Sequence, residues 1–130
     1  MSVSAKQSNS QIVSISPHII AVNTGLDLNA TGVTASTWVN GASLATHFPT
    51  MIIVELASGA IGGAVFKPRA NATVLFTQSL AVLTTVNYRA GFNIANNFLL
   101  ANTGNLDVNI STASSVACTA NIYWVGISLV

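Results

Sequence analysis

The sequence predicts an all-β fold, and three observations lead to that prediction. No long segment keeps the 3.6-residue apolar period of an amphipathic helix. Short runs rich in Val, Ile, Thr and aromatic residues recur instead, separated by Gly, Asn and Pro. Turn signals return about every 8–12 residues, which is typical of an antiparallel sandwich or barrel. A chain of 130 residues predicts one domain with a sizeable core.

Ten runs are predicted as strands, and neighbouring runs could be fused or bent halves of one strand. In chain order they are Gln11–Ser16, Ile19–Asn23, Val33–Val39, Thr50–Leu56, Ile61–Phe66, Thr73–Thr77, Leu80–Val86, Tyr88–Ile94, Leu106–Ser111 and Cys118–Val130. The turn signals between them are Thr24-Gly25, Asn40-Gly41, Ser58-Gly59, Pro68, Asn96-Asn97 and Thr103-Gly104. Residues 1–10 are polar and Ser-rich, which predicts a flexible arm ahead of a domain over residues 11–130.

The composition predicts a protein that either stays soluble through neutral hydroxyls and amides or covers much of its surface with copies of itself or another protein. Charged residues make up 5% of the chain and hydrophobic residues 51%, whereas an ordinary soluble domain is about a quarter charged. Two strands, Met51-Ile52-Ile53-Val54 and Ile122-Tyr123-Trp124-Val125, do not alternate with polar residues. A strand that is apolar on both faces needs cover on both sides. We therefore expect a homo-oligomer.

Several function classes are disfavoured by the sequence. There is no G-x-S-x-G elbow, phosphate-binding loop, H-E-x-x-H or dinucleotide motif, so we expect no enzyme and no cofactor. A net charge of +1 without a basic run argues against nucleic acid as a partner. The stretch Pro49–Phe66 contains Glu55 and two glycine breaks, so two buried strands are favoured there over a membrane span. No apolar segment near the N-terminus resembles a signal peptide.

Glu55 and Arg89 are the sharpest candidate site residues, because each lies among apolar neighbours in a predicted strand. A buried carboxylate must be paired or hydrogen-bonded, which predicts a buried ion pair between them. The alternative is that Glu55 faces water on an edge strand. The candidate interface strand is the last one, with Ile122, Tyr123, Trp124, Val125, Ile127 and Leu129.

Other polar and aromatic residues permit two interpretations each. The pairs Asp27/Asn29 and Asp107/Asn109 offer oxygen ligands for calcium, but solvated strand faces are favoured and no metal site is expected. The segments Leu26–Thr31 and Leu106–Ser111 resemble each other, by chance or by duplication. His18 and His47 are expected to be turn or packing residues, and Cys118 a small buried hydrophobe. The four larger aromatics are either core and interface anchors or a sugar-binding platform, namely Trp38, Tyr88, Tyr123 and Trp124.

The overall character of the chain resembles small virion proteins of tailed bacteriophages. The features that carry the resemblance are small size, near-neutral composition, a polar N-terminus and the final strand Tyr123–Val130. These proteins are capsid decoration (cement) proteins and head-fibre or tail-tip modules. The final strand is also similar to that of trimeric jelly rolls of the tumour-necrosis-factor type.

The resemblance implies a jelly-roll-like sandwich of about eight strands, with little or no helix, that forms a homotrimer. It implies a place on the outer surface of the virion, where the protein binds the major capsid protein or another virion protein and stabilises the shell. Residues 1–11 contain a single basic residue, Lys6, which favours the outer surface over contact with packaged nucleic acid. The alternatives are a receptor- or glycan-binding tip module and a secreted adhesin or pilin-like subunit.

Overall fold

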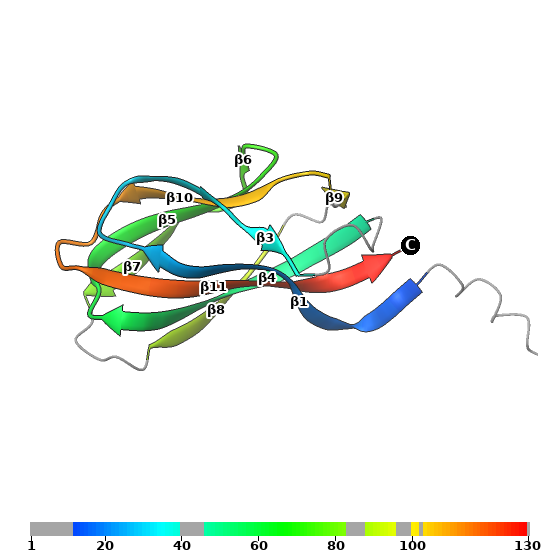
Figure 1. Ribbon diagram of the computed structural model, residues 1–130, viewed down its shortest axis with the longest axis horizontal. Helices are drawn as coiled ribbons and strands as arrows, with labels where there is room; N and C mark the ends of the chain where they lie inside the picture. The colour runs from blue at the N-terminus through cyan, green and yellow to red at the C-terminus, as the bar shows by residue number, and fades with distance from the viewer. Residues whose placement is uncertain (1–11, 40–45, 83–87, 96–99, 102, 130) are drawn as a thin grey trace, which may run out of the picture.

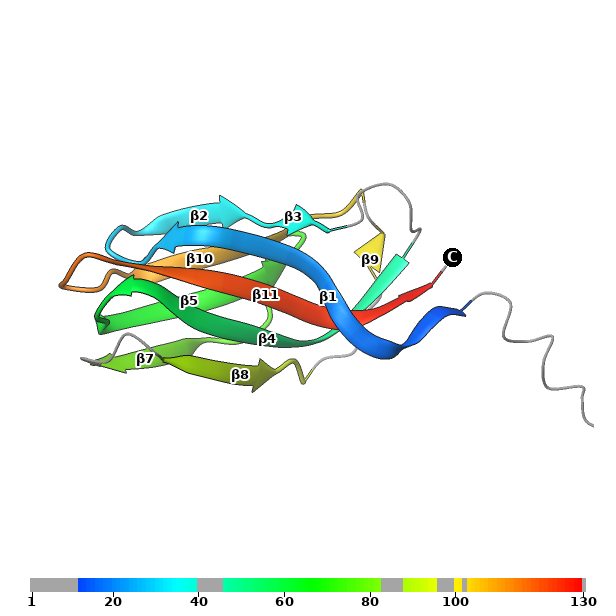
Figure 2. The ribbon, with the colours of Figure 1, turned by 60° about the horizontal axis from the view of Figure 1, so that its bottom comes forward.

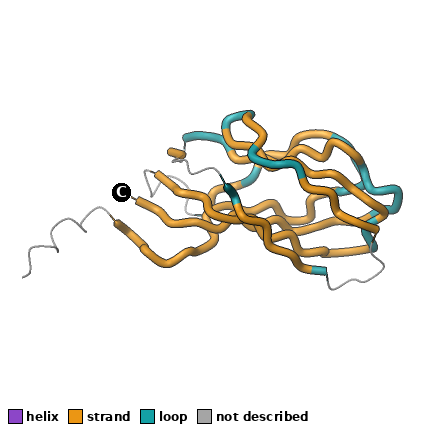
Figure 3. The backbone as a smooth tube through the Cα atoms, turned by 180° about the vertical axis from the view of Figure 1, so that it is seen from behind, coloured by secondary structure: helices purple, strands orange, loops and turns teal. Residues whose placement is uncertain are grey.

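The computed structural model describes residues 12–39, 46–82, 88–95, 100–101 and 103–129. All regular secondary structure in these ranges is β-strand, as the sequence predicts, and the strands form two antiparallel sheets (Figure 3). Within the same ranges no helix occurs that is long and apolar enough to cross a membrane. The predicted arm, residues 1–10, lies outside the described residues.

Eleven strands are present in the described ranges. They are β1 (Ile12–Asp27), β2 (Gly32–Ala35), β3 (Thr37–Trp38), β4 (Thr46–Gly59), β5 (Gly62–Ala70), β6 (Thr73–Val74), β7 (Gln78–Val82), β8 (Arg89–Asn93), β9 (Leu100–Ala101), β10 (Leu106–Thr112) and β11 (Cys118–Leu129). Three of them, β3, β6 and β9, have two residues each and extend the edges of longer strands.

The strands are divided between two sheets, which we call sheet A and sheet B. Sheet A has the order β3-β1-β11-β4-β8, and β9 also pairs with β4. Sheet B has the order β2-β10-β5-β6, and β7 also pairs with β5. Figure 2 shows β1, β11, β4 and β8 side by side in front of β2, β10, β5 and β7. Figure 1 shows the same two layers from another side.

The core lies between the sheets and is built by the alternation of side chains along each strand. Ile52, Val54 and Leu56 of β4 point inward, and so do Ile122 and Trp124 of β11. Sheet B contributes Phe66, Leu80, Leu106, Val108 and Ile110. Phe66 also contacts Phe76 and Phe92 edge-on, at centroid distances of 6.0 and 5.7 Å. Cys118 is buried among these residues, as expected.

Two turn predictions are wrong because the signal residues lie in bulged or interrupted strands. Thr24-Gly25 lies inside β1, where the register with β11 shifts between Asn23 and Leu26 and Gly25 takes a φ of +65°. The predicted strands at Gln11–Ser16 and Ile19–Asn23 are therefore one long strand. Pro68 lies within β5, and the turn comes at Asn71 and Ala72, with φ of 48° and 69°. The prediction at Asn40-Gly41 falls outside the described residues.

Pro68 fits inside β5 because its missing N–H faces a gap in the pairing. β10 pairs along one edge of β5. On the other edge, β7 pairs with the residues up to Phe66 and β6 pairs with those from Arg69 onward, which leaves Pro68 between them. The carbonyl of Pro68 accepts a hydrogen bond from the Leu75 N–H on that shared edge, at 2.8 Å. Because N–H and C=O of one strand residue point to the same side, no bond to β10 is lost.

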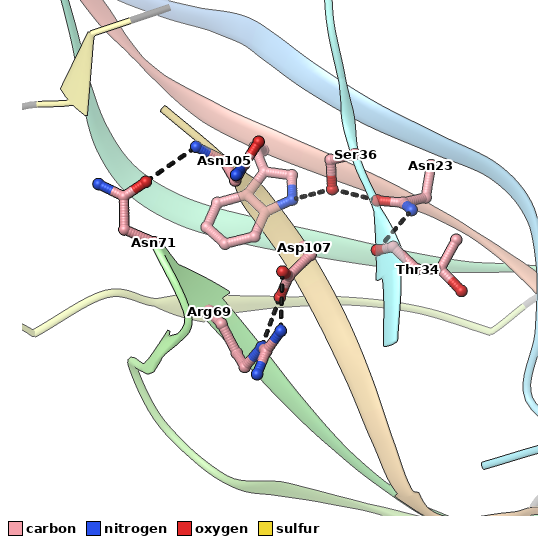
Figure 4. Close-up of polar contacts among 8 residues, drawn as sticks. Asn23, Thr34, Ser36, Arg69, Asn71, Asn105 and Asp107 are labelled. Carbon is pink, nitrogen blue, oxygen red and sulfur yellow. Dashed lines mark hydrogen bonds and ion pairs between the residues drawn. The ribbon is translucent and has the colours of Figure 1, made fainter. Parts of the chain in front are cut away.

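A polar network inside the sandwich holds β1, β2 and β11 together. The indole N–H of Trp124 donates to Ser36 Oγ at 3.0 Å, and that hydroxyl donates to the side-chain carbonyl of Asn23. The Asn23 amide donates in turn to the carbonyl of Thr34 at 3.4 Å (Figure 4) and to that of Ala35 at 3.0 Å. Trp124, Ser36 and Asn23 each have a hydrogen-bond partner in this network, which keeps the burial of their polar atoms from being costly.

Candidate interaction face

The outer face of sheet A, which we call face A, is mostly apolar. Its side chains come from positions on β1, β4 and β11 that alternate with the inward core residues, so they point away from sheet B. Most of them are half-buried by one another, and Ile19 is 42% exposed. Face A consists of Ile19, Val22, Phe48, Met51, Ile53, Tyr123, Val125 and Ile127.

The strand register places these side chains in rows across the sheet. Val22 lies opposite Tyr123, which lies opposite Ile53 on β4 and then Gly91 on β8. Ile19, Val125 and Met51 form the next row, and Ile127 lies opposite Phe48. The Met51 methyl group lies over Gly91, since a Cβ there would come within 2.6 Å of it. Face A is thus a continuous apolar surface across neighbouring strands.

A four-residue polar cluster borders face A on β4, β8 and β11. Glu55 accepts hydrogen bonds from Arg89 Nη1 at 2.8 Å, from the Tyr123 hydroxyl at 3.1 Å and from the Asn121 amide at 3.4 Å. The bonds from Asn121 and Tyr123, followed by Arg89, hold the pKa of Glu55 below its usual value. Burial and the neighbouring carboxylate raise the pKa of Tyr123.

The structure brings Glu55 and Arg89 together as expected, but the expectation that the pair is buried is wrong. The Arg89 side chain is 58% exposed and that of Glu55 is 34% exposed. The reason is that both residues occupy outward positions of sheet A, opposite each other in the register. The two residues next to Glu55, Val54 and Leu56, point to the other side of the sheet.

The predicted interface strand divides between the two faces of sheet A. Ile122 and Trp124 belong to the core, with 1% and 0% exposure, so the expectation that they form an interface is wrong. Tyr123, Val125 and Ile127 lie on face A, where they are available for contact. The side chain of Leu129 is outside the described part of the chain.

The outer face of sheet B is more polar and carries a different ion pair. Arg69 Nε and Nη2 donate to the two carboxylate oxygens of Asp107 at 2.6 and 3.0 Å (Figure 4). Asp107 is 8% exposed although it points outward. The bond to Asp107 raises the pKa of Arg69. Lys67 lies opposite Asn109 on the same face. The charges of sheet B are thus separated by the whole sandwich from the apolar side chains of face A.

The structure gives Asp27 and Asp107 local structural contacts. Asp27 Oδ1 accepts the backbone N–H of Asn29 at 2.8 Å in the turn after β1, and Asp107 pairs with Arg69. Among the described residues no group of three or more His, Cys, Asp or Glu side chains gathers in one place. The segment Leu26–Thr31 spans a strand end and a turn, whereas Leu106–Ser111 lies within β10. The two similar segments therefore have different structures.

The four aromatic residues that were candidates for a sugar platform do not share one surface. Trp124 is 0% exposed, and Trp38 stacks on His47 with ring centroids 4.4 Å apart. Tyr88 packs against the core, and burial raises its pKa. Only Tyr123, of these four, belongs to face A.

Sequence reasoning missed most of face A and a buried histidine site. Because Met51–Val54 is apolar on both faces of the strand, the sequence indicated that both faces of β4 are covered, but it did not show which residues point outward. His18 and His47 lie in β1 and β4 rather than in turns, and both contact Ser128 of β11. Sequence separations of 110 and 81 residues hid that meeting.

No protein-family model matches this chain, and a comparison with curated proteins finds no significant match. The features of the molecule that bear on its function are therefore the strand order, face A and the placement of the charged residues.

Proposed function

We propose that this protein is a structural subunit of a virus particle, a capsid decoration protein that self-associates through face A and stabilises the shell from outside. The observation that carries the proposal is the continuous apolar surface of eight side chains on three adjacent strands. Exposed apolar patches of this kind mark interaction sites or aggregation hazards. A stable assembly turns such a face into an interface.

The strand order supports a jelly roll as the finer description of this sandwich. If the short strands β3, β6 and β9 are set aside, eight principal strands remain in the described ranges. Numbered along the chain, they follow the order 1-8-3-6 in sheet A and 2-7-4-5 in sheet B. That is the strand order of a jelly roll, an architecture that recurs in viral capsid and lectin domains. The architecture alone does not define a function.

A trimer is the assembly that we propose, because the resemblance to trimeric jelly rolls implies one and face A offers an apolar surface that a neighbouring subunit can cover. Face A has few charges to desolvate, and the Glu55–Arg89 pair lies at its border with balanced charge. The more polar outer face of sheet B would remain in water or contact the shell. The chain has no catalytic role in this proposal, since the carboxylates Glu55 and Asp107 are each held by an arginine.

The virion role is tested by co-sedimentation with shells assembled from the major capsid protein of the same genome. We expect the purified protein to pellet with the shells at a fixed ratio and to raise their melting temperature. Protein that stays in the supernatant at every concentration would contradict the decoration role.

A second candidate, a glycan-binding module, is favoured by the polar cluster at the border of face A. An aromatic ring beside a carboxylate, a guanidinium and an amide is a combination that sugar sites use, and Tyr123, Glu55, Arg89 and Asn121 provide it. A glycan array distinguishes the two candidates. Specific binding of one sugar class, abolished by Tyr123→Ala, would favour this second function over capsid decoration.

A further inference from the structure

Two histidines share one serine hydroxyl at one end of the sandwich. Ser128 Oγ lies 3.0 Å from His47 Nδ1 and 3.1 Å from His18 Nε2. Ser128 is 0% exposed and His47 is 1% exposed. The three residues come from the first part of β1, the first part of β4 and the last part of β11, which lie side by side near the C-terminus (Figure 1).

The hydroxyl can satisfy both histidines only while at least one ring nitrogen is unprotonated. A serine hydroxyl has one proton to donate, so it donates to one imidazole nitrogen and accepts an N–H from the other. If both contacting nitrogens carried protons, the hydroxyl proton would lose its acceptor between them. The observed contacts therefore require an unprotonated nitrogen on at least one of the two rings.

A protonated His47 would have no hydrogen-bond acceptor for its Nε2 proton among the described residues. Its Nε2 atom is buried and has no hydrogen-bond partner among the described residues. The ring stacks on Trp38 with an interplanar angle of 17°, which keeps that side apolar. Adding a proton would bury a positive charge and an unpaired N–H donor, and both are costly.

We propose that His18, Ser128 and His47 form an acid-sensitive latch, which holds the ends of β1, β4 and β11 together at neutral pH and loosens them when the solution is acidified. The latch controls a specific part of the fold. N-terminal to His18, the start of β1 pairs with the end of β11 in the described part of the chain, and the register shifts there between Ile12, Ser14 and His18.

No described carboxylate stands close enough to neutralise a protonated His47. The groups packed around it are Ser128 of β11, His18 of β1, Trp38 of β3 and Leu100 of β9. The described charges lie elsewhere, on the outer faces of the sheets or at the last residue of β1. They are Asp27, Glu55, Lys67, Arg69, Arg89 and Asp107. The only titratable group facing His47 in the described part of the chain is His18, whose charge opposes protonation.

The direction of the pH effect follows from the histidine that is buried. Burial, and to a lesser degree His18, lowers the pKa of His47 below its value in the unfolded chain, about 6.5. The unfolded or open state then binds more protons than the closed state. The latch is complete above that unfolded value, and its contribution falls as the pH drops from there through the folded-state pKa. Each pH unit in this window favours opening by up to about tenfold for one proton.

Amide hydrogen exchange on the unmodified protein tests the latch at pH 7.5 and pH 5.5, after correction for intrinsic exchange rates. We expect the protection of amides around His18 in β1 and around Ser128 in β11 to fall by up to about tenfold. Amides of β5 and β10 in sheet B should keep most of their protection. Equal protection at both pH values, or the same loss in both sheets, would overturn the proposal.

The variant His47→Phe provides the matched comparison, because it keeps a ring against Trp38 and removes the titrating nitrogens. We expect its protection in β1 and β11 to be nearly the same at both pH values. The control variant His18→Gln keeps His47 and should retain the loss on acidification. The chain has two histidines, so no third histidine can mask the result. A His47→Phe protein that loosens like the parent would also overturn the latch.

Discussion

At the scale of single residues, the two ion pairs differ in exposure and therefore in how much each contributes to folding stability. Asp107 accepts two hydrogen bonds from Arg69 in a covered site, whereas Arg89 reaches Glu55 with one bond at an exposed site. Exposed pairs are screened by water and salt, while a covered pair leaves an unpaired charge when one partner is removed.

We therefore expect Asp107→Asn to lower the melting temperature clearly more than Glu55→Gln. Both substitutions replace one carboxylate oxygen with an amide and keep the shape of the side chain, so each controls for the other. Thermal unfolding at pH 7 followed by circular dichroism measures the difference. Equal melting temperatures of the two variants would show that the burial of Asp107 does not strengthen its ion pair with Arg69.

Particular residues show why the site was only partly predictable from sequence. The pairing of Glu55 with Arg89 was predictable, because the sequence contains few charged residues and both of these lie in predicted strands. Their exposure was not, because a strand apolar on both faces conceals which side is the core. Ser128 is one of 14 serines in the chain, and nothing local distinguishes it from the others.

At the scale of elements, two adjacent residues of β4 distinguish the stability of the fold from the strength of self-association. Ile52 is 0% exposed in the core, and Ile53 lies next to it on face A. Ile52→Ala should lower the free energy of unfolding by about 2–5 kcal/mol, since it leaves a cavity. Ile53→Ala should cost less in unfolding and should weaken self-association instead. Denaturant titration and analytical ultracentrifugation measure the two effects, and the reverse ranking would contradict the assignment of the faces.

Gly126 of β11 is required at the bulge where β11 meets β4. A Cβ there would collide with the backbone carbonyl oxygen of Phe48 and come within 2.9 Å of Pro49 Cα. Backbone atoms cannot move aside cheaply, so we expect Gly126→Ala to destabilise the protein by about 1–3 kcal/mol. Gly91→Ala is the control, because it meets only the flexible end of Met51. Chemical denaturation of both variants checks this, and equal losses would be inconsistent with a backbone collision.

The strands themselves were largely predictable, and the errors have physical causes. Runs of Val, Ile and aromatic residues correctly marked β4, β8, β10 and β11, because these residues fit a pleated, half-buried surface. The sequence predicts turns at Thr24-Gly25 and Pro68, because it does not show when such residues lie at a β-bulge or at a gap in strand pairing. Strand order could not be read from the sequence, since it depends on pairings between distant segments such as β1 and β11.

At the scale of the whole molecule, the apolar character of face A predicts how assembly responds to salt. Screening weakens interactions between charges and leaves apolar contacts nearly unchanged. We expect the self-association constant to vary little between 50 mM and 1 M sodium chloride. Sedimentation velocity at both concentrations measures it. A steep loss of association at high salt would show that charged residues dominate the interface.

The oligomeric state of the parent and of face variants tests the proposed self-association most directly. Size-exclusion chromatography with light scattering should give a trimer for the parent at micromolar concentration. Ile53→Lys and Val125→Lys place a charge on face A and should give monomers, whereas Val65→Lys, on the outer face of sheet B, should remain trimeric. A monomeric parent, or face A variants that assemble as well as Val65→Lys, would contradict the role of face A.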